Sequence, residues 1–240
     1  MLILGTGIVL PGLPLSKALK DLYDDFSGPV YALKESQLSP NGKWTGMYTG
    51  QGSLGTREDP ADPGRAFFFA RPAPAFGESR INSDQATTSG THSALVLSTQ
   101  SFGRSFRLSL DMMTEEQTRR GSQPNTWEAA WVMWNYVDRW HHYYFVLKTN
   151  GSELGKKDNS MQLEKQVFLA TPPSPKLELG RWHHVDVVVN ENRVTVDVDG
   201  KRAIDAVDPD MSSYFDGGGK IGLYTEDAAV RFANVRVSPY

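Results

Sequence analysis

Residues 179–207 read LGRWHHVDVVVNENRVTVDVDGKRAIDAV, and this stretch decides the fold. Apolar and polar residues alternate in two runs, 183–190 and 193–198, with Asn190-Glu191-Asn192 as a turn between them. Asp199-Gly200 is a second turn, before a third short run. Alternation with a period of two turns one side of each strand toward a core. The stretch therefore predicts a hairpin extended by one more antiparallel strand.

The rest of the chain continues the same pattern. Turn residues separate further candidate strands, which are 91–99, 106–113, 127–136, 141–148, 165–170, 220–226 and 229–237. This spacing predicts an antiparallel sandwich or barrel, and one domain is the simplest count for 240 residues. The segment 39–90 is rich in Gly, Pro, Ser and Asp, so we expect a loop with a short strand or two over one end of the sandwich.

Three stretches resemble a known superfamily. Gly180-x-Trp182-His183 opens one strand of the hairpin and Val198-Asp199-Gly200 closes the next. Residues 217–237 contain Gly-x-Ile-Gly-Leu followed by Phe-x-Asn-Val, and DDFSG at 24–28 suits a first strand that pairs beside the last. The chain resembles the concanavalin A-like lectin and glucanase superfamily, which includes laminin-G-like and family-16-glycosidase-like domains. The resemblance implies an all-β, two-sheet antiparallel jelly roll over residues 24–240, whose concave face often receives a saccharide.

Residues 1–23 are expected to form an N-terminal arm and a short helix from Lys17 to Tyr23, capped by Ser16. The apolar run before Lys17 has no basic residue ahead of it and is broken by Gly and Pro, so it does not read as a signal peptide or a membrane span. We expect the arm to dock onto a neighbouring subunit. An extracellular or virion location, as a tail or adhesion component, is the corresponding expectation.

Composition excludes several classes of function. Lys+Arg 25 against Asp+Glu 28 gives a net charge of -3 without a basic block, so neither nucleic acid nor a membrane is an expected partner. The absence of cysteine excludes disulfides, thiolate zinc sites and a cysteine nucleophile. The superfamily often binds Ca²⁺ where the first and last strands meet, which would place it at Asp24 and Asp25, although Ala233 stands where many relatives have an acidic residue. No other cofactor is expected.

The tetrapeptide Arg-Trp-His-His occurs at 139–142 and again at 181–184, and it holds four of the five histidines. Successive strand residues point to opposite faces, so neither histidine pair can chelate one ion. Each copy can lend one histidine to a shared site, but zinc needs a third ligand and the sequence marks none. No metal site is therefore expected from these histidines.

The strands 127–136 and 141–148 are where a binding site is expected. Alternation assigns Trp131 and Met133 to the core and places Trp134 on the opposite, groove-lining face. Flat aromatic rings beside carboxylate and ammonium groups suit a pyranose, which has an apolar face and hydroxyl groups. The candidate carbohydrate-binding residues are Glu128, Trp134, Tyr136, Asp138, His142, Tyr144, Lys148, Glu153 and Lys156. The alternative is that Glu128 and Lys148 form a buried ion pair while the tryptophans fill the core.

A lectin-like, glycan-binding module acting on a cell-surface or extracellular polysaccharide is the function that this pattern favours. The alternative is a glycoside hydrolase-like enzyme in the same groove, which needs two carboxyl groups about 5–10 Å apart. The available carboxyls are Glu128, Asp138, Glu153 and Asp158, and no spacing selects a pair. The Glu-x-Asp-x-x-Glu strand of family-16 glycosidases, the Gln-x-His strand of sandwich lyases and the Gly-x-Ser-x-Gly elbow are absent from the sequence. No catalytic residue is assigned.

Overall fold

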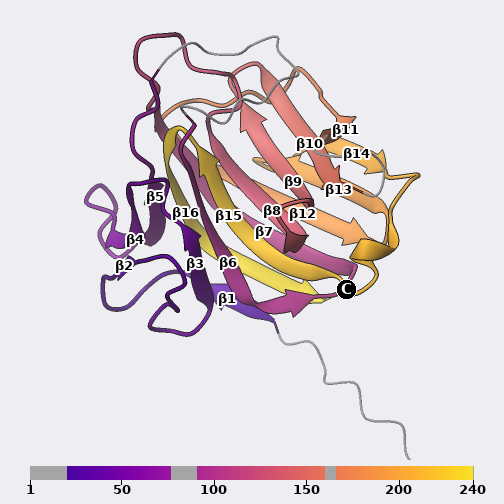
Figure 1. Ribbon diagram of the computed structural model, residues 1–240, viewed down its shortest axis with the longest axis horizontal. Coiled ribbons are helices and arrows are strands. Elements are labelled where there is room, and N and C mark those ends of the chain that lie inside the picture. Colours follow the sequence, from indigo (N-terminus) through magenta and orange to yellow (C-terminus); the bar gives the residue numbers. More distant parts are fainter. Residues whose placement is uncertain (1–20, 77–90, 160–165, 240) are drawn as a thin grey trace, which may run out of the picture.

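The computed structural model describes residues 21–76, 91–159 and 166–239, and these form two antiparallel β-sheets that face each other (Figure 1). The first sheet has nine strands. They are β1 (Leu22–Asp24), β2 (Ala32–Leu33), β4 (Ser53–Glu58), β5 (Ala66–Arg71), β7 (Ser105–Gln117), β12 (His183–Asn190), β13 (Arg193–Val198), β14 (Lys201–Val207) and β16 (Ala228–Pro239). Their order is β14-β13-β12-β7-β16-β5-β4-β2, with β1 against β16.

The second sheet has seven strands. They are β3 (Trp44–Tyr48), β6 (Ser93–Phe102), β8 (Ala130–Asp138), β9 (His141–Lys148), β10 (Gly151–Asp158), β11 (Gln166–Ala170) and β15 (Gly219–Glu226), in the order β11-β10-β9-β8-β15-β6-β3. A single 3-10 turn, η1 (Ser213–Phe215), is the helical element in the described residues. No helix there is long and apolar enough to cross a membrane. The predicted all-β, two-sheet jelly roll is confirmed.

The hairpin that decides the fold forms as its pattern predicts. Val185, Val187 and Val189 of β12 are buried, and β12 pairs on one side with β13 and on the other with β7. Asp199 adopts a φ of 51°, a left-handed conformation that aspartate tolerates in a tight turn. The hairpin thereby extends the nine-stranded sheet to its β14 edge.

The first strand pairs with the last, as predicted, because β1 lies antiparallel to β16, but it spans residues 22–24 and not the predicted 24–28. Leu22 is buried opposite Val237, and this pairing makes residues 22 and 23 a strand rather than the end of the predicted helix. Propensity favoured a helix there, but a local preference is weaker than a buried strand pairing. The rest of the predicted helix and the N-terminal arm lie outside the described residues.

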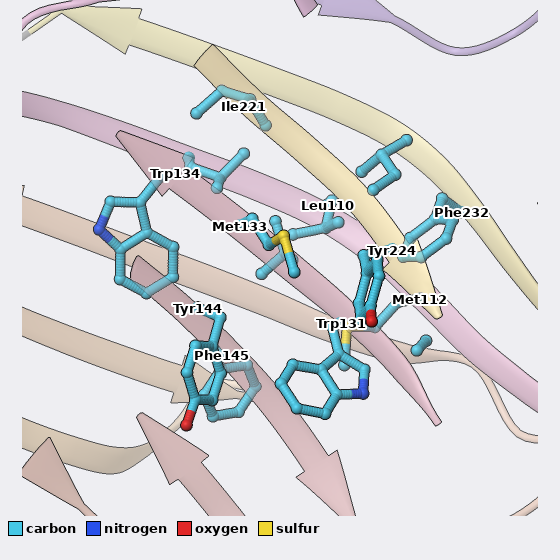
Figure 2. Packing of buried hydrophobic residues seen from close by; sticks show 14 of the residues in the cluster. Leu110, Met112, Trp131, Met133, Trp134, Tyr144, Phe145, Ile221, Tyr224 and Phe232 are labelled. Atoms are coloured by element: carbon cyan, nitrogen blue, oxygen red, sulfur yellow. The ribbon is translucent and has the colours of Figure 1, made fainter. Parts of the chain in front are cut away.

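Buried aromatic and aliphatic side chains fill the space between the sheets, and the same cluster continues onto the other face of the seven-stranded sheet with Trp131, Tyr144 and Tyr224 (Figure 2). On the seven-stranded sheet, Trp134 and Tyr143 are paired neighbours whose rings stack at 6.2 Å. The hydroxyl of Tyr143 donates to Asp208, which directly follows β14 of the other sheet. Trp134 and Tyr143 therefore mark the core face of this sheet, and residues that alternate with them mark its outer face.

Candidate functional site

A β-bulge in β8 sets which residues reach the outer face. Directly paired residues of antiparallel strands share a face, and Trp131 pairs with both Val146 and Tyr224. Met133 continues this face, but the next outward residue is Tyr136, because the register shifts at Asn135, whose φ is 46°. The bulge thus restarts the alternation one residue out of phase.

Aromatic rings form a continuous cluster on the outer face. The Trp131 ring lies 4.8 Å from that of Tyr144 on β9 and 5.6 Å from that of Tyr224 on β15, in a near-perpendicular arrangement with Tyr224 (Figure 2). Tyr48 of β3 meets Tyr224 edge-on at 6.5 Å. Four strands therefore supply rings to one face of the sheet. The rings are tightly packed, since Trp131 is 4% exposed, Tyr144 is fully buried and Tyr224 is 7% exposed.

Two glutamates lie beside these rings. Glu153 of β10 accepts a 3.0 Å hydrogen bond from the Tyr144 hydroxyl. The same carboxylate forms an ion pair with the Lys148 ammonium at 2.5 Å. Glu226 accepts a 2.5 Å hydrogen bond from the Tyr224 hydroxyl, which is also 3.1 Å from the Ser93 hydroxyl. Each carboxylate thus accepts a hydrogen bond from a tyrosine hydroxyl. The negative charges of both glutamates help to raise the pKa of Tyr144.

Burial controls the protonation states on this face. Desolvation is the main cause that raises the pKa of Glu226, with the nearby Asp227 adding to it, while the Tyr224 hydrogen bond and Lys157 oppose it. Desolvation also raises the pKa of Tyr48, Tyr144 and Tyr224, so these hydroxyls stay protonated donors at neutral pH. The pKa of His142 falls to about 4, mainly by desolvation, so its ring is neutral.

Five of the predicted binding residues share this outer face with the aromatic cluster. They are Tyr136, His142, Tyr144, Lys148 and Glu153. Figure 2 shows the Tyr144 ring beside Trp131, in agreement with its place in the cluster. Whether these residues bind a saccharide stays a prediction.

Trp134 and Lys156 are placed differently from the prediction. Trp134 is fully buried on the core face, so the predicted roles of Trp131 and Trp134 are exchanged. The prediction was wrong for two reasons: Glu128 does not lie on β8, and the bulge breaks the alternation of β8. Lys156 is equally buried and donates to Asp208 at 2.7 Å and to the Asp210 carbonyl at 2.8 Å. Its ammonium also lies 3.4 Å from Asp158.

Glu128 and Asp138 lie outside the outer face. Glu128 is buried just before β8, where it accepts hydrogen bonds from Arg119 at 2.5 Å and from Asn125 at 2.7 Å. Arg119 also donates to Asp227 at 2.7 Å. Asp138, the last residue of β8, accepts a hydrogen bond from the Trp140 backbone and contacts the His141 ring. A buried ion pair was the stated alternative for Glu128, but its partner is Arg119, and Lys148 pairs with Glu153 instead.

Sequence reasoning missed Trp131, Tyr224 and Glu226 as site residues. Trp131 was assigned to the core by the unbroken alternation. Tyr224 and Glu226 share a strand face with Lys220 and Gly222, an alternation that was readable in KIGLYTE. The mixed aromatic and acidic character of that face was the available signal.

The two Arg-Trp-His-His copies lie in different sheets and share no site. His141 stacks on Tyr214 with ring centroids 3.8 Å apart, whereas His142 stacks on Tyr136 at 5.4 Å. In the second copy, His183 contacts Asp199 and His184 contacts Asp111. Within the described ranges, no group of three acidic, histidine or cysteine side chains is arranged to hold a metal ion.

Asp24, where calcium was considered, is engaged by the protein itself. Its carboxylate accepts hydrogen bonds from the Trp44 indole at 2.7 Å, the Asn41 amide at 3.0 Å and the Phe26 backbone at 3.1 Å. Asp25 accepts from the backbone and hydroxyl of Ser27. The contacts of Asp24 with Asn41 and Trp44 join the end of β1 to β3 and to the loop before it.

Comparison with known families identifies the relationship. A model of the 3-keto-alpha-glucoside-1,2-lyase-like domain matches residues 41–238. The chain belongs to this family. The match includes every strand from β3 to β15 and most of β16, and it therefore includes the whole outer face described above. No curated protein matches the sequence.

Solved structures with the same sandwich accompany this family assignment. A carbohydrate-binding module, CBM66 from Bacillus subtilis, superposes with a TM-score of 0.54 at 17% identity, covering 82% of this chain and 96% of that one. A structure from work on endo-acting O-glycanases of the human gut microbiota has a TM-score of 0.55 at 11% identity, covering 91% and 98%. A GH43 protein of Bacillus licheniformis has a TM-score of 0.50 at 13% identity, covering 96% of this chain and 41% of that chain. At these identities the likeness establishes the fold, which is one that carbohydrate-binding modules use.

Proposed function

We propose that the chain binds a saccharide on the outer face of its seven-stranded sheet. The observation that carries this proposal is the Trp131–Tyr144–Tyr224 cluster with a glutamate beside each tyrosine. Aromatic rings stack on the apolar face of a pyranose, while carboxylate oxygens and protonated tyrosine hydroxyls pair with its hydroxyl groups. The resemblance of the sandwich to a carbohydrate-binding module supports the same reading.

The partner in this proposal is an extracellular or cell-surface polysaccharide. The fold that the chain shares with a carbohydrate-binding module supports a polysaccharide partner, and an extracellular place of action is part of the same proposal. A role as a virion or adhesion component adds one requirement, which is docking of the N-terminal arm onto a neighbouring subunit. Deletion of residues 1–14 tests it, because a truncated chain that assembles as well as the full chain contradicts arm docking.

A glycan array tests saccharide binding directly, with Trp131→Ala as the site variant. Trp182→Ala is the matched control, since Trp182 is a half-buried tryptophan that contacts Arg65 and Phe67 of the other sheet. We expect wild type and Trp182→Ala to bind the same glycans and Trp131→Ala to bind none. Equal binding by Trp131→Ala would remove the outer face as the site.

A second function, cleavage of a 3-keto-glycoside by elimination, is favoured by the family match and by Glu226. A ketone at C3 acidifies the proton on C2, so a base that takes this proton lets the C1–C2 double bond form as the C1–oxygen bond breaks. The leaving alkoxide then gains a proton and departs as an alcohol. Burial raises the pKa of Glu226, which makes its carboxylate a stronger base, and the Tyr224 hydroxyl is a proton donor beside it.

A turnover assay separates the two functions. Methyl 3-keto-α-glucoside is incubated with the protein, and released methanol is measured. The elimination function predicts release by wild type and none by Glu226→Gln. If wild type releases no methanol but binds glycans on the array, binding alone is the function of the face.

A further inference from the structure

Four side chains form a row at one end of the outer face. Lys157 of β10 pairs directly with His142 of β9, and Lys220 of β15 pairs directly with Tyr136 of β8. The two rings between the lysines stack nearly parallel, at 5.4 Å and 16°. The row therefore runs from an ammonium group across two flat rings to a second ammonium group.

Both rings of the row are uncharged at neutral pH. Desolvation is the main cause that lowers the pKa of His142 to about 4 and that raises the pKa of Tyr136 above its ordinary value. Neither ring neutralises or adds to the lysine charges, so the row carries the charge of its two ammonium groups.

The two lysines have no ion pair with any residue in the described ranges. Lys148 and Lys156, by contrast, are both paired with carboxylates. The Lys157 ammonium instead lies 5.4 Å from the centre of the Trp140 ring, and the Arg139 guanidinium lies 4.4 Å from the centre of the same ring. Lys157 and Lys220 are both half-buried, and a partly desolvated charge without a counter-ion is stabilised when an anion arrives.

The acidic groups near the row form no ion pair with either lysine in the part of the chain that the structure describes. Asp138 hydrogen-bonds the His141 ring at 3.0 Å, and Glu226 influences Lys157 only through space. At the opposite end of the face, Glu153 is neutralised by Lys148. The outer face is therefore polarised, with paired or hydrogen-bonded carboxylates at one end and two unpaired ammonium groups at the other.

We propose that the row Lys157–His142–Tyr136–Lys220 receives the anionic substituents of an acidic saccharide, uronate carboxylates in the first instance. This inference rests on the proposed function, which it deepens by naming the class of sugar. The stacked rings contact the sugar ring, and the ammonium group at each end of the row pairs with a carboxylate of the bound saccharide. The two lysine positions are three interstrand spacings apart, about 14 Å, so they pair with carboxylates of different sugar units. A sulfate ester presents the same charge, and the test distinguishes it from a uronate.

The test combines a glycan array of neutral, uronic and sulfated glycans with calorimetry on two matched probe pairs. One pair is oligogalacturonate and its methyl ester, and the other is dextran sulfate and dextran. The variant is Lys157→Gln/Lys220→Gln. Lys201→Gln is the control for loss of a positive charge, because Lys201 is exposed on β14 of the other sheet. Thermal melting establishes that each variant is folded.

We expect wild type and Lys201→Gln to bind oligogalacturonate at least roughly tenfold more tightly than its ester, the size of one charge-assisted contact. The double variant should bind acid and ester alike, and added salt should weaken only the acid. Preference for dextran sulfate over both uronate probes, lost in the double variant, would reassign the row to sulfated sugars.

Two results overturn the inference, and they are distinguishable from failure of the proposed function. The first is equal affinity of wild type for acidic and neutral glycans. The second is an acid preference that the double variant keeps. In both cases, binding that Trp131→Ala abolishes would leave the proposed function standing. Wild type that binds no glycan of any class on the array removes both proposals.

Discussion

The hydroxyl of Tyr224 donates a 2.5 Å hydrogen bond to Oε1 of Glu226, two residues farther along β15. Residues two apart in a strand share a face, so regular strand geometry is sufficient to bring this pair together. The tyrosine also contacts the Trp131 ring, and the pair therefore joins the aromatic cluster to its carboxylate. Any ligand on this part of the face meets both groups.

The raised pKa of Glu226 predicts a specific pH dependence of stability. A carboxyl whose folded pKa exceeds its unfolded value contributes stability that is fully present below the unfolded pKa and is lost as pH rises through the folded pKa. We therefore expect wild type to lose stability relative to Glu226→Gln as pH rises from about 4 toward neutral. Chemical denaturation of both proteins across this range measures the difference. A difference independent of pH would contradict the raised pKa.

Trp131 and Trp134 separate binding from stability. Trp134 is fully buried and stacks on Tyr143, so Trp134→Ala should cost about 3–5 kcal/mol of unfolding free energy through the cavity it leaves. Trp131 is itself only 4% exposed, so Trp131→Ala should also destabilise the fold, but it alone of the two variants should abolish saccharide binding. Urea denaturation and glycan binding are measured on both variants. Binding that Trp134→Ala abolishes and folded Trp131→Ala keeps would invert the face assignment.

Arg119 is expected to be essential because it neutralises two buried carboxylates, Glu128 and Asp227. Arg119→Met leaves both charges unpaired and should cost about 3–5 kcal/mol at neutral pH. The cost should shrink in acid, because burial already raises the pKa of both carboxyls and protonation removes the unpaired charge. Arg193→Met is the control, since its pair with Asp205 is exposed and should leave stability nearly unchanged at every pH.

Chelation is expected to leave the melting temperature unchanged. The Asp24 carboxylate already accepts three hydrogen bonds, and Lys43 lies 3.6 Å from it, so its charge is compensated without an ion. Differential scanning calorimetry with EDTA and with added calcium measures this. A melting temperature that falls with EDTA and returns with calcium would establish a site at the junction of the first and last strands.

The all-β sandwich was predictable because apolar and polar residues alternate with a period of two along its strands. The β12 valines alternate cleanly, and the β12–β13 turn has residues suited to it. The pairing of β1 with β16 was accessible only through the resemblance, since 22–24 is too short to signal a strand by periodicity. Local propensity gave a helix there instead.

The site was predictable only where the alternation was unbroken. In β9 the residues on the outer face, including His142 and Tyr144, were predicted correctly because the strand is regular. In β8 the strand was assumed to start at Trp127, and the left-handed Asn135 has no unique sequence signature. Tyr136 was nevertheless placed on the correct face because two errors cancelled, the wrong phase before the bulge and the missing bulge itself.

Asn135 gives β8 one position at which a residue can be lost without changing the surface. Deleting Asn135 would remove the extra residue between Trp134 and Tyr136 and restore the strict period, with Trp134 still on the core face and Tyr136 still on the outer face. Deleting a residue just before it would instead turn the side chains between that deletion and Asn135 to the opposite face, and Trp134 would then point outward. The gene can therefore lose the Asn135 codon and keep its ligand surface, whereas the loss of a neighbouring codon exchanges core and surface residues.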